Sequence, residues 1–213
     1  MEQRSSELST GQRWFAQAIS IVFHPLFLGV FIAAFLIFGG PYLFQSFTAQ
    51  QRMRFFMMFT NNNLIFPLLV VGLLKGLGFS SSIILHTQKE RIVPYMATTI
   101  FFFWTYYVLR NQTDTPRLMV EFCRGLFFTS AAALLFNNYF KISMHGMGVG
   151  TLWGVWILGM VQGYLPLDAS GAIAIGLGSV ILVARRMISD HNWFELIAGV
   201  VVGAIAQCIG IWL

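Results

Sequence analysis

Long apolar runs constrain this chain more than any other sequence feature. A helix that crosses the roughly 30 Å hydrocarbon of a bilayer needs about 20 apolar residues, because each residue rises about 1.5 Å. Seven runs are candidates for such spans: 16–38, 55–74, 92–109, 122–140, 147–165, 169–184 and 193–213. The mean hydropathy is +0.71 and 57% of the residues are hydrophobic, so little of the chain remains for anything but short loops. The sequence therefore predicts a multi-pass membrane protein.

We expect an all-α fold, a polytopic membrane bundle of six to seven transmembrane helices, in a single integral membrane domain over residues 1–213. The second run is the least secure span, because Asn61, Asn62 and Asn63 interrupt it and would have to face protein or water. Cys123 and Cys208 both fall within predicted spans, so no disulfide framework is indicated. The formal net charge of +5 is dispersed among loops, which favours anionic lipid headgroups as partners and not nucleic acid.

The alternation of spans predicts that three polar loops share one face of the membrane. The loops 86–95, 141–146 and 185–191 are separated by even numbers of predicted crossings. They hold three histidines, three arginines and two lysines: His86, His145, His191, Arg91, Arg185, Arg186, Lys89 and Lys141. The loops on the opposite face contain no histidine. This predicts a cationic, histidine-rich cluster at one membrane surface, and the simpler alternative is that loops are polar wherever they lie.

The end of the last polar loop and the start of the final run carry a histidine and a carboxylate at helical spacing. His191 and Glu195 are four residues apart at the start of the final run, so their side chains lie on one helix face. A neighbouring carboxylate raises the basicity of an imidazole and fixes its orientation. Arg185 lies across a turn, from which it could converge on the same point. The alternative is an Arg–Glu pair that caps the span and anchors it at the headgroup level.

These residues resemble the signatures of a known family. Arg185, five residues, His191, three residues and Glu195 resemble the third signature, SRxxxxxHxxxD, of the type 2 phosphatidic acid phosphatase superfamily of membrane lipid phosphatases. The residues "SMH" at 143–145 resemble its second signature, PSGH, and two predicted helices separate the two motifs, as in the family. The segment "KERIVP", with Lys89 and Arg91, carries the charges of the first signature, KxxxxxxRP, at a different spacing. The departures are Ala184 for Ser, Glu195 for Asp, Ile142 for Pro and Met144 for Gly.

The resemblance runs from Lys89 to Gly203, which makes residues 81–213 the phosphatase-like core and leaves 1–80 outside it. It implies hydrolysis of a phosphomonoester or diphosphate of a membrane lipid through a phosphohistidine. The implied catalytic residues are His191 as nucleophile, Glu195 as its orienting carboxylate and His145 as proton donor. The implied phosphate-binding groups are Arg185, Ser143, Met144, Arg91 and Lys89. The scheme needs no metal and no cofactor. It places the site on the extracytoplasmic side of a cell membrane, the bacterial inner membrane, and the basic residues outside the site favour the same orientation.

Two other functions compete with hydrolysis. The substituted signatures could belong to a non-catalytic relative that binds or transports lipids. The four histidines could instead bind a metal, since imidazole is a common ligand, although no HxxxH or CxxC spacing supports a site. His24, before Pro25 in the first run, is either a hydrogen-bonded histidine beside a proline kink or a further member of the cluster. Gly199 and Gly203 form GxxxG, which predicts close helix packing within the chain or, less favoured, across a homodimer.

Overall fold

The computed structural model describes residues 8–40, 43–79, 88–139, 141–189 and 191–213, and every regular element in them is helical. Six helical segments are long and apolar enough to cross a membrane, and a bent helix pair at the N-terminal end would make a seventh span. The prediction of an all-α membrane bundle of six to seven spans is confirmed, and the chain is a multi-pass membrane protein.

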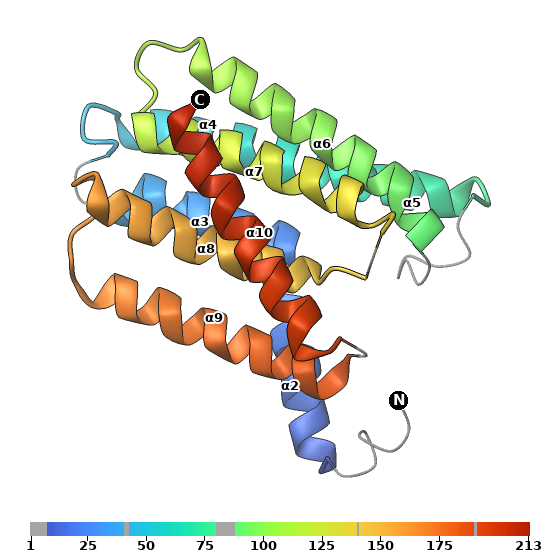
Figure 1. The fold of residues 1–213 in the computed structure, drawn as a ribbon. Coiled ribbons are helices and arrows are strands. Elements are labelled where there is room, and N and C mark those ends of the chain that lie inside the picture. The colour runs from blue at the N-terminus through green and yellow to red at the C-terminus, as the bar shows by residue number, and fades with distance from the viewer. Residues whose placement is uncertain (1–7, 41–42, 80–87, 140, 190) are drawn as a thin grey trace.

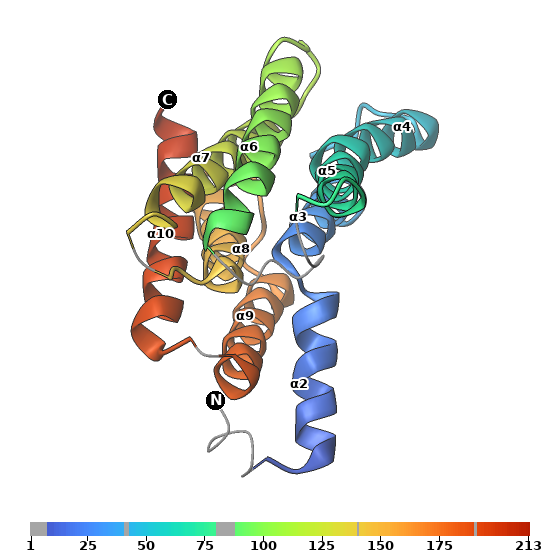
Figure 2. The ribbon, with the colours of Figure 1, turned by 90° about the vertical axis from the view of Figure 1, so that its right-hand side faces the viewer.

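The spans pack side by side along most of the chain (Figure 1). The second segment is continuous from Ala49 to Gly76. It is followed by α6 (Gln88–Arg110), α7 (Arg117–Phe136), α8 (Met144–Val161), α9 (Ala169–Ile188) and α10 (Trp193–Trp212). α10 packs against both α7 and α8. The two α-helices of the second segment, α4 (Ala49–Thr60) and α5 (Phe66–Gly76), lie on the side of the bundle away from α10 (Figure 2). The starts of α6, α8 and α10 and the end of α9 lie at the same end of the bundle, on the right in Figure 1.

The first apolar run, which we predicted as a span over 16–38, is sharply bent at the proline. It forms α2 (Thr10–Val22), α3 (Pro25–Ala34) and the π-helix η1 (Phe35–Gly39), and α2 is bent by 62° from the segment that follows. The break lies at His24 and Pro25 because proline has no N–H to donate and its ring disfavours helical geometry in the preceding residue. α2 therefore runs across the direction of α3 and packs against α9 (Figure 1).

The three asparagines of the second segment do not interrupt its helix. α4 (Ala49–Thr60) continues through the π-helix η2 (Asn61–Ile65) into α5 (Phe66–Gly76). The Asn63 amide donates to the carbonyl oxygen of Phe59 at 2.9 Å and to Thr105 Oγ1 of α6 at 3.1 Å. Pro67 follows Asn63 by four residues and cannot supply the usual helical donor, which accounts for the local π-turn. Asn63 is thus buried against protein, as a membrane span requires, and Asn62 donates to the Met58 carbonyl oxygen of its own helix, whereas Asn61 is exposed.

Glycines bring α8 and α10 into backbone contact. A Cβ added to Gly199 would lie 2.6 Å from the carbonyl oxygen of Ser143, and one added to Gly203 would overlap the carbonyl oxygen of Met147. On the facing helix, a Cβ on Gly150 would overlap the carbonyl oxygen of Val200. The close packing predicted from GxxxG therefore occurs within the chain. It holds the first turns of α8 and α10 together, the two turns that carry the histidine motifs.

We expect Gly203→Ala to destabilise the protein by about 1–3 kcal/mol, because the added methyl group must push α8 and α10 apart. The matched control is Gly176→Ala on α9, where a Cβ meets nothing within 4 Å. Thermal unfolding in detergent, followed by circular dichroism, compares the two variants. A midpoint for Gly203→Ala equal to that of Gly176→Ala would contradict the packing described.

Candidate functional site

A cavity of about 580 Å³ opens among α2, α3, α5, α6, α7, α8 and the end of α9. One part of its wall is polar and is formed by side chains from distant segments: Ser20, His24, Arg91, His145, Arg185 and His191. Most of the remaining wall is apolar and comes from α3, α5, α6, α7 and α8. The cavity therefore joins a polar end to an apolar interior.

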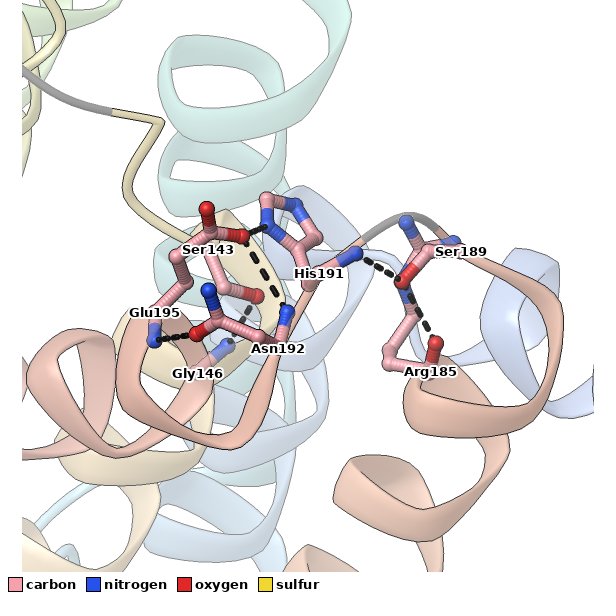
Figure 3. Close-up of polar contacts among 7 residues, drawn as sticks. All are labelled: Ser143, Gly146, Arg185, Ser189, His191, Asn192 and Glu195. Carbon is pink, nitrogen blue, oxygen red and sulfur yellow. Dashed lines mark hydrogen bonds and ion pairs between the residues drawn. The ribbon is translucent and has the colours of Figure 1, made fainter. Parts of the chain in front are cut away.

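His191 is held by the start of α10. Asn192 caps this helix, since its side-chain oxygen accepts the Glu195 N–H at 2.8 Å. The Glu195 carboxylate accepts the Asn192 N–H at 3.3 Å and also lies 2.8 Å from Nδ1 of His191 (Figure 3). A carboxylate only accepts, so Nδ1 carries the proton and Nε2 keeps its lone pair. The sequence-predicted pair of His191 and Glu195 is thus formed.

The surroundings of His191 keep its imidazole neutral. Burial lowers the pKa of His191 below its ordinary value of 6.5, while the hydrogen bond and charge of Glu195 act in the opposite direction. The positive charges of Arg185 and Lys141 lower the pKa further. At pH 7 the ring is therefore a neutral base with an available Nε2 lone pair.

His145 lies in the first turn of α8 and is buried. Its Nε2 lies 3.0 Å from the backbone oxygen of Ser20 and 3.4 Å from the Ser20 hydroxyl. Because a carbonyl oxygen only accepts, Nε2 carries the proton and Nδ1 is the acceptor nitrogen of the neutral ring. The His24 ring packs edge-on against His145 with centroids 5.6 Å apart.

Arg185 supplies positive charge at the centre of the polar wall. Its Nη1 donates to Ser20 Oγ at 2.8 Å, and its Nε is buried with no hydrogen-bond partner among the described residues. The guanidinium is close enough to interact electrostatically with the imidazoles of His24, His145 and His191. Arg185 also interacts electrostatically with Arg91. An arginine with an unused buried donor beside a cavity is suited to bind an anion.

The structure brings together most, but not all, of the residues that the sequence singled out. His191, His145, Arg185, Arg91 and Met144 line the cavity, and Glu195 supports His191 from behind. Ser143 does not line it: its buried hydroxyl accepts the Gly146 N–H at 3.2 Å and so caps α8 (Figure 3). Lys89 is exposed and is not part of the wall. His86 lies outside the described residues.

Two residues of the N-terminal segment, Ser20 and His24, belong to the site, and of these the sequence offered only His24 as a possible member of the cluster. Ser20 was not singled out, although it precedes His24 by the four residues that place both on one helix face. His24 caps α3, since Nδ1 accepts the Leu26 N–H at 3.4 Å, and it also lines the cavity. The bend before Pro25 is what turns both residues towards the end of the bundle where α8 begins and α9 ends.

In the part of the chain that the structure describes, no three side chains of His, Cys, Asp or Glu form a group that could hold a metal ion. No known protein family, curated protein or solved structure matches the chain.

We expect single cysteines at the two ends of the bundle to label from opposite sides of the membrane. In a Cys208→Ser background, Lys89→Cys and Asn192→Cys should react with an impermeant maleimide from one side, and Gln112→Cys only from the other. All three positions are exposed, and the native Cys123 is buried. Labelling of Lys89→Cys and Asn192→Cys from different sides would contradict the shared face of the site.

Proposed function

We propose that this protein is a membrane lipid phosphatase that hydrolyses a phosphomonoester or diphosphate through a phosphohistidine on His191. The observation that carries the proposal is that His145, Arg185, His191 and Arg91, from three distant segments, line one cavity. A neutral imidazole that attacks, a second imidazole that carries a proton when phosphate is bound, and two cations are groups that phosphoryl transfer through histidine can use. The resemblance of the signatures around these residues points to the same chemistry.

In the proposed reaction the lone pair on His191 Nε2 attacks phosphorus, and the bond between phosphorus and the leaving oxygen breaks. The leaving oxygen takes a proton from His145, which then accepts a proton from the water that attacks the phosphohistidine. Phosphate leaves and His191 regains its lone pair. Because the Ser20 carbonyl holds the Nε2 proton of His145, the transferable proton is the one on Nδ1, whose protonation a bound phosphate favours.

Glu195 and the cations of the wall stabilise the charges that develop. The His191 ring becomes positive when phosphorus bonds to Nε2, and the carboxylate on Nδ1 stabilises that charge. Arg185 and Arg91 neutralise the phosphoryl oxygens. Met144 begins α8 and lines the cavity, so the positive end of the helix dipole also favours an anion there. The Ser143 hydroxyl contributes through the helix cap that it forms.

The shape of the cavity supports a lipid as the substrate. Arg91 and Phe102 both line it and are separated by 11 residues of α6, which corresponds to about 16 Å along the helix. The cavity therefore extends from the polar end to about half the depth of a hydrocarbon core of roughly 30 Å. Its inner wall is apolar, with Leu28, Ile32 and Leu126 among the lining residues. A phosphate at the polar end would place an acyl or isoprenoid chain along this wall.

We place the site on the extracytoplasmic side of the membrane. The opposite end of the bundle carries five arginines that belong to no phosphate-binding group: Arg52, Arg54, Arg110, Arg117 and Arg124. The family resemblance implies this orientation, and Lys and Arg are common on the cytoplasmic side of multi-pass proteins. In a bacterium the protein would lie in the inner membrane with its cavity facing the periplasm.

We expect purified protein in detergent to release inorganic phosphate from at least one lipid phosphate without added divalent metal. The panel is phosphatidate, phosphatidylglycerophosphate, undecaprenyl diphosphate and lipid A. His191→Ala should reduce release to the background rate, and His145→Ala should lower kcat about 10²–10⁴-fold. The matched control is Ser179→Ala on α9, whose exposed hydroxyl donates to the Ile175 carbonyl of its own helix and lies outside the cavity wall.

Other outcomes of this assay favour the competing functions. Activity that is lost on chelation and restored by zinc would overturn the metal-independent reaction in favour of a metal site. The absence of turnover on the whole panel, with lipid binding retained, would favour a non-catalytic lipid-binding protein.

The pH dependence tests the roles of His191 and Glu195. Protonation of His191 removes the attacking lone pair, so kcat/KM should fall as the pH drops through a pKa below 6.5. Glu195→Gln removes the charge that raises this pKa, so the acidic limb should move to still lower pH. The plateau rate should also fall on the order of a hundredfold, because a neutral amide stabilises the positive ring less. An acidic limb that stays in place or moves to higher pH would contradict the assignment.

A further inference from the structure

Ser20 connects α2 to both a cation and an imidazole of the cavity. We propose that Ser20 is a positioning residue of the anion site, which orients Arg185 through its hydroxyl and His145 through its carbonyl. The inference rests on the proposed function only for the identity of the anion as a phosphoryl group. With this role for Ser20, α2 contributes a positioning residue to the site, although α2 lies outside the region of family resemblance.

The hydroxyl of Ser20 fixes the guanidinium of Arg185. Ser20 is 7% exposed, and its Oγ accepts a hydrogen bond from Arg185 Nη1 at 2.8 Å. A guanidinium is planar and rigid, so fixing one terminal nitrogen restricts the directions of the other donors. One of these, Nε, is buried and has no partner among the described residues. The bond to Ser20 thus fixes Arg185 while its Nε–H remains available to donate to an anion in the cavity.

The carbonyl of Ser20 fixes the ring of His145. α2 ends at Val22, so the last carbonyl groups of the helix need partners from outside the regular helical pattern. The Phe23 and His24 amides bond to Ile19 and Ile21, and Pro25 has no amide hydrogen to donate. The Ser20 oxygen instead accepts from His145 Nε2 at 3.0 Å. This bond leaves Nδ1 of His145 as the nitrogen available for proton transfer.

The amphipathic character of α2 keeps Ser20 directed into the bundle. Ala16 and Ser20, one turn apart, are the buried residues of this helix. The opposite face is exposed and apolar, with Trp14, Phe15 and Ile21 each more than 60% exposed. A helix with a tryptophan on an exposed apolar face is typical of the membrane interface. The bilayer and α9 therefore hold α2 from opposite sides and set the position of Ser20.

The two contacts of Ser20 can be separated experimentally. Ser20→Ala removes the hydroxyl and keeps the backbone carbonyl, so it should release Arg185 while His145 keeps its bond. The matched control is Ser179→Ala on α9, whose exposed hydroxyl only donates to the Ile175 carbonyl of its own helix at 2.9 Å. Thermal unfolding of both variants shows whether the fold is retained. If Ser20→Ala does not fold, Ser20→Cys replaces it, because a thiol of similar size is a much weaker acceptor.

Two readouts of full-length protein in detergent test the proposal. The first is hydrogen exchange of the Arg185 Nε–H by 15N NMR, assigned with Arg185→Lys, which does not depend on activity. We expect exchange to be at least tenfold faster in Ser20→Ala than in the wild type and unchanged in Ser179→Ala. The second is the affinity for inorganic phosphate by calorimetry, which should fall about tenfold or more in Ser20→Ala, as expected for loss of a charge-assisted hydrogen bond. The acidic limb of kcat/KM should stay in place, because His191 is untouched.

The outcomes separate this inference from the proposed function. Faster exchange in Ser20→Ala with no phosphate binding or turnover by the wild type would uphold the positioning of Arg185 and reject the phosphatase. Unchanged exchange would overturn the positioning role, whatever the phosphate affinity. A fall in phosphate affinity with unchanged exchange would mean that the hydroxyl contacts the anion directly, which also overturns it.

Discussion

Backbone contact between α8 and α10 is the constraint on which the rest of the structure depends. At the glycine pairs 146/150 and 199/203 no side chain separates the two helices, so their main chains are in direct contact there. The Ser143 N–H donates to the Glu195 carbonyl oxygen at 3.4 Å, which joins the two first turns directly. Since His145 and the His191–Glu195 pair are in or next to these turns, their relative position is set by backbone and not by flexible loops. The proposed phosphoryl transfer would depend on this rigidity, because displacements of about 1 Å are costly to a positioned reaction.

Hydrogen bonds hold the two histidines and Arg185 of the site in place and leave some of their donor and acceptor atoms unbonded within the described part of the chain. The Ser20 carbonyl at the end of α2 accepts a hydrogen bond from His145, and the Glu195 carboxylate at the start of α10 accepts one from His191. The Ser20 hydroxyl accepts a hydrogen bond from Arg185. Each bond meets the requirement for buried hydrogen-bonding groups. Each also fixes which nitrogen of a ring holds the proton or how a guanidinium is oriented. The hydrogen bonds that stabilise these buried groups are therefore the same ones that orient them for the proposed anion.

Much of the fold could be predicted from the sequence because the signals are local. The lengths of the apolar runs predict the spans, and counting crossings predicts that the segments around Arg91, His145 and His191 share one end. The four-residue spacing of His191 and Glu195 predicts their hydrogen bond, which is formed. Each of these predictions needs only helix periodicity and the thickness of a bilayer.

The parts that could not be predicted depend on tertiary contacts. Pro25 indicates a kink, but not that the bend of 62° would direct α2 across the bundle and bring Ser20 to Arg185. The Ser143 hydroxyl has two possible partners in the sequence, an incoming phosphate or the amide three residues on, and the structure uses it as a helix cap. Lys89 is one of several cations near the predicted cluster, and nothing in its spacing shows that its side chain would be exposed.

The central claim is that His191 is a nucleophile positioned by three converging segments. The most direct measurement is mass spectrometry of the protein after rapid alkaline quenching during turnover of a lipid phosphate, conditions under which phosphohistidine survives. The account predicts a phosphoryl group on the peptide that contains His191 in the wild type and none on that peptide in His191→Ala. Steady turnover with no phosphoryl group on His191, or with one on a different residue, would contradict it.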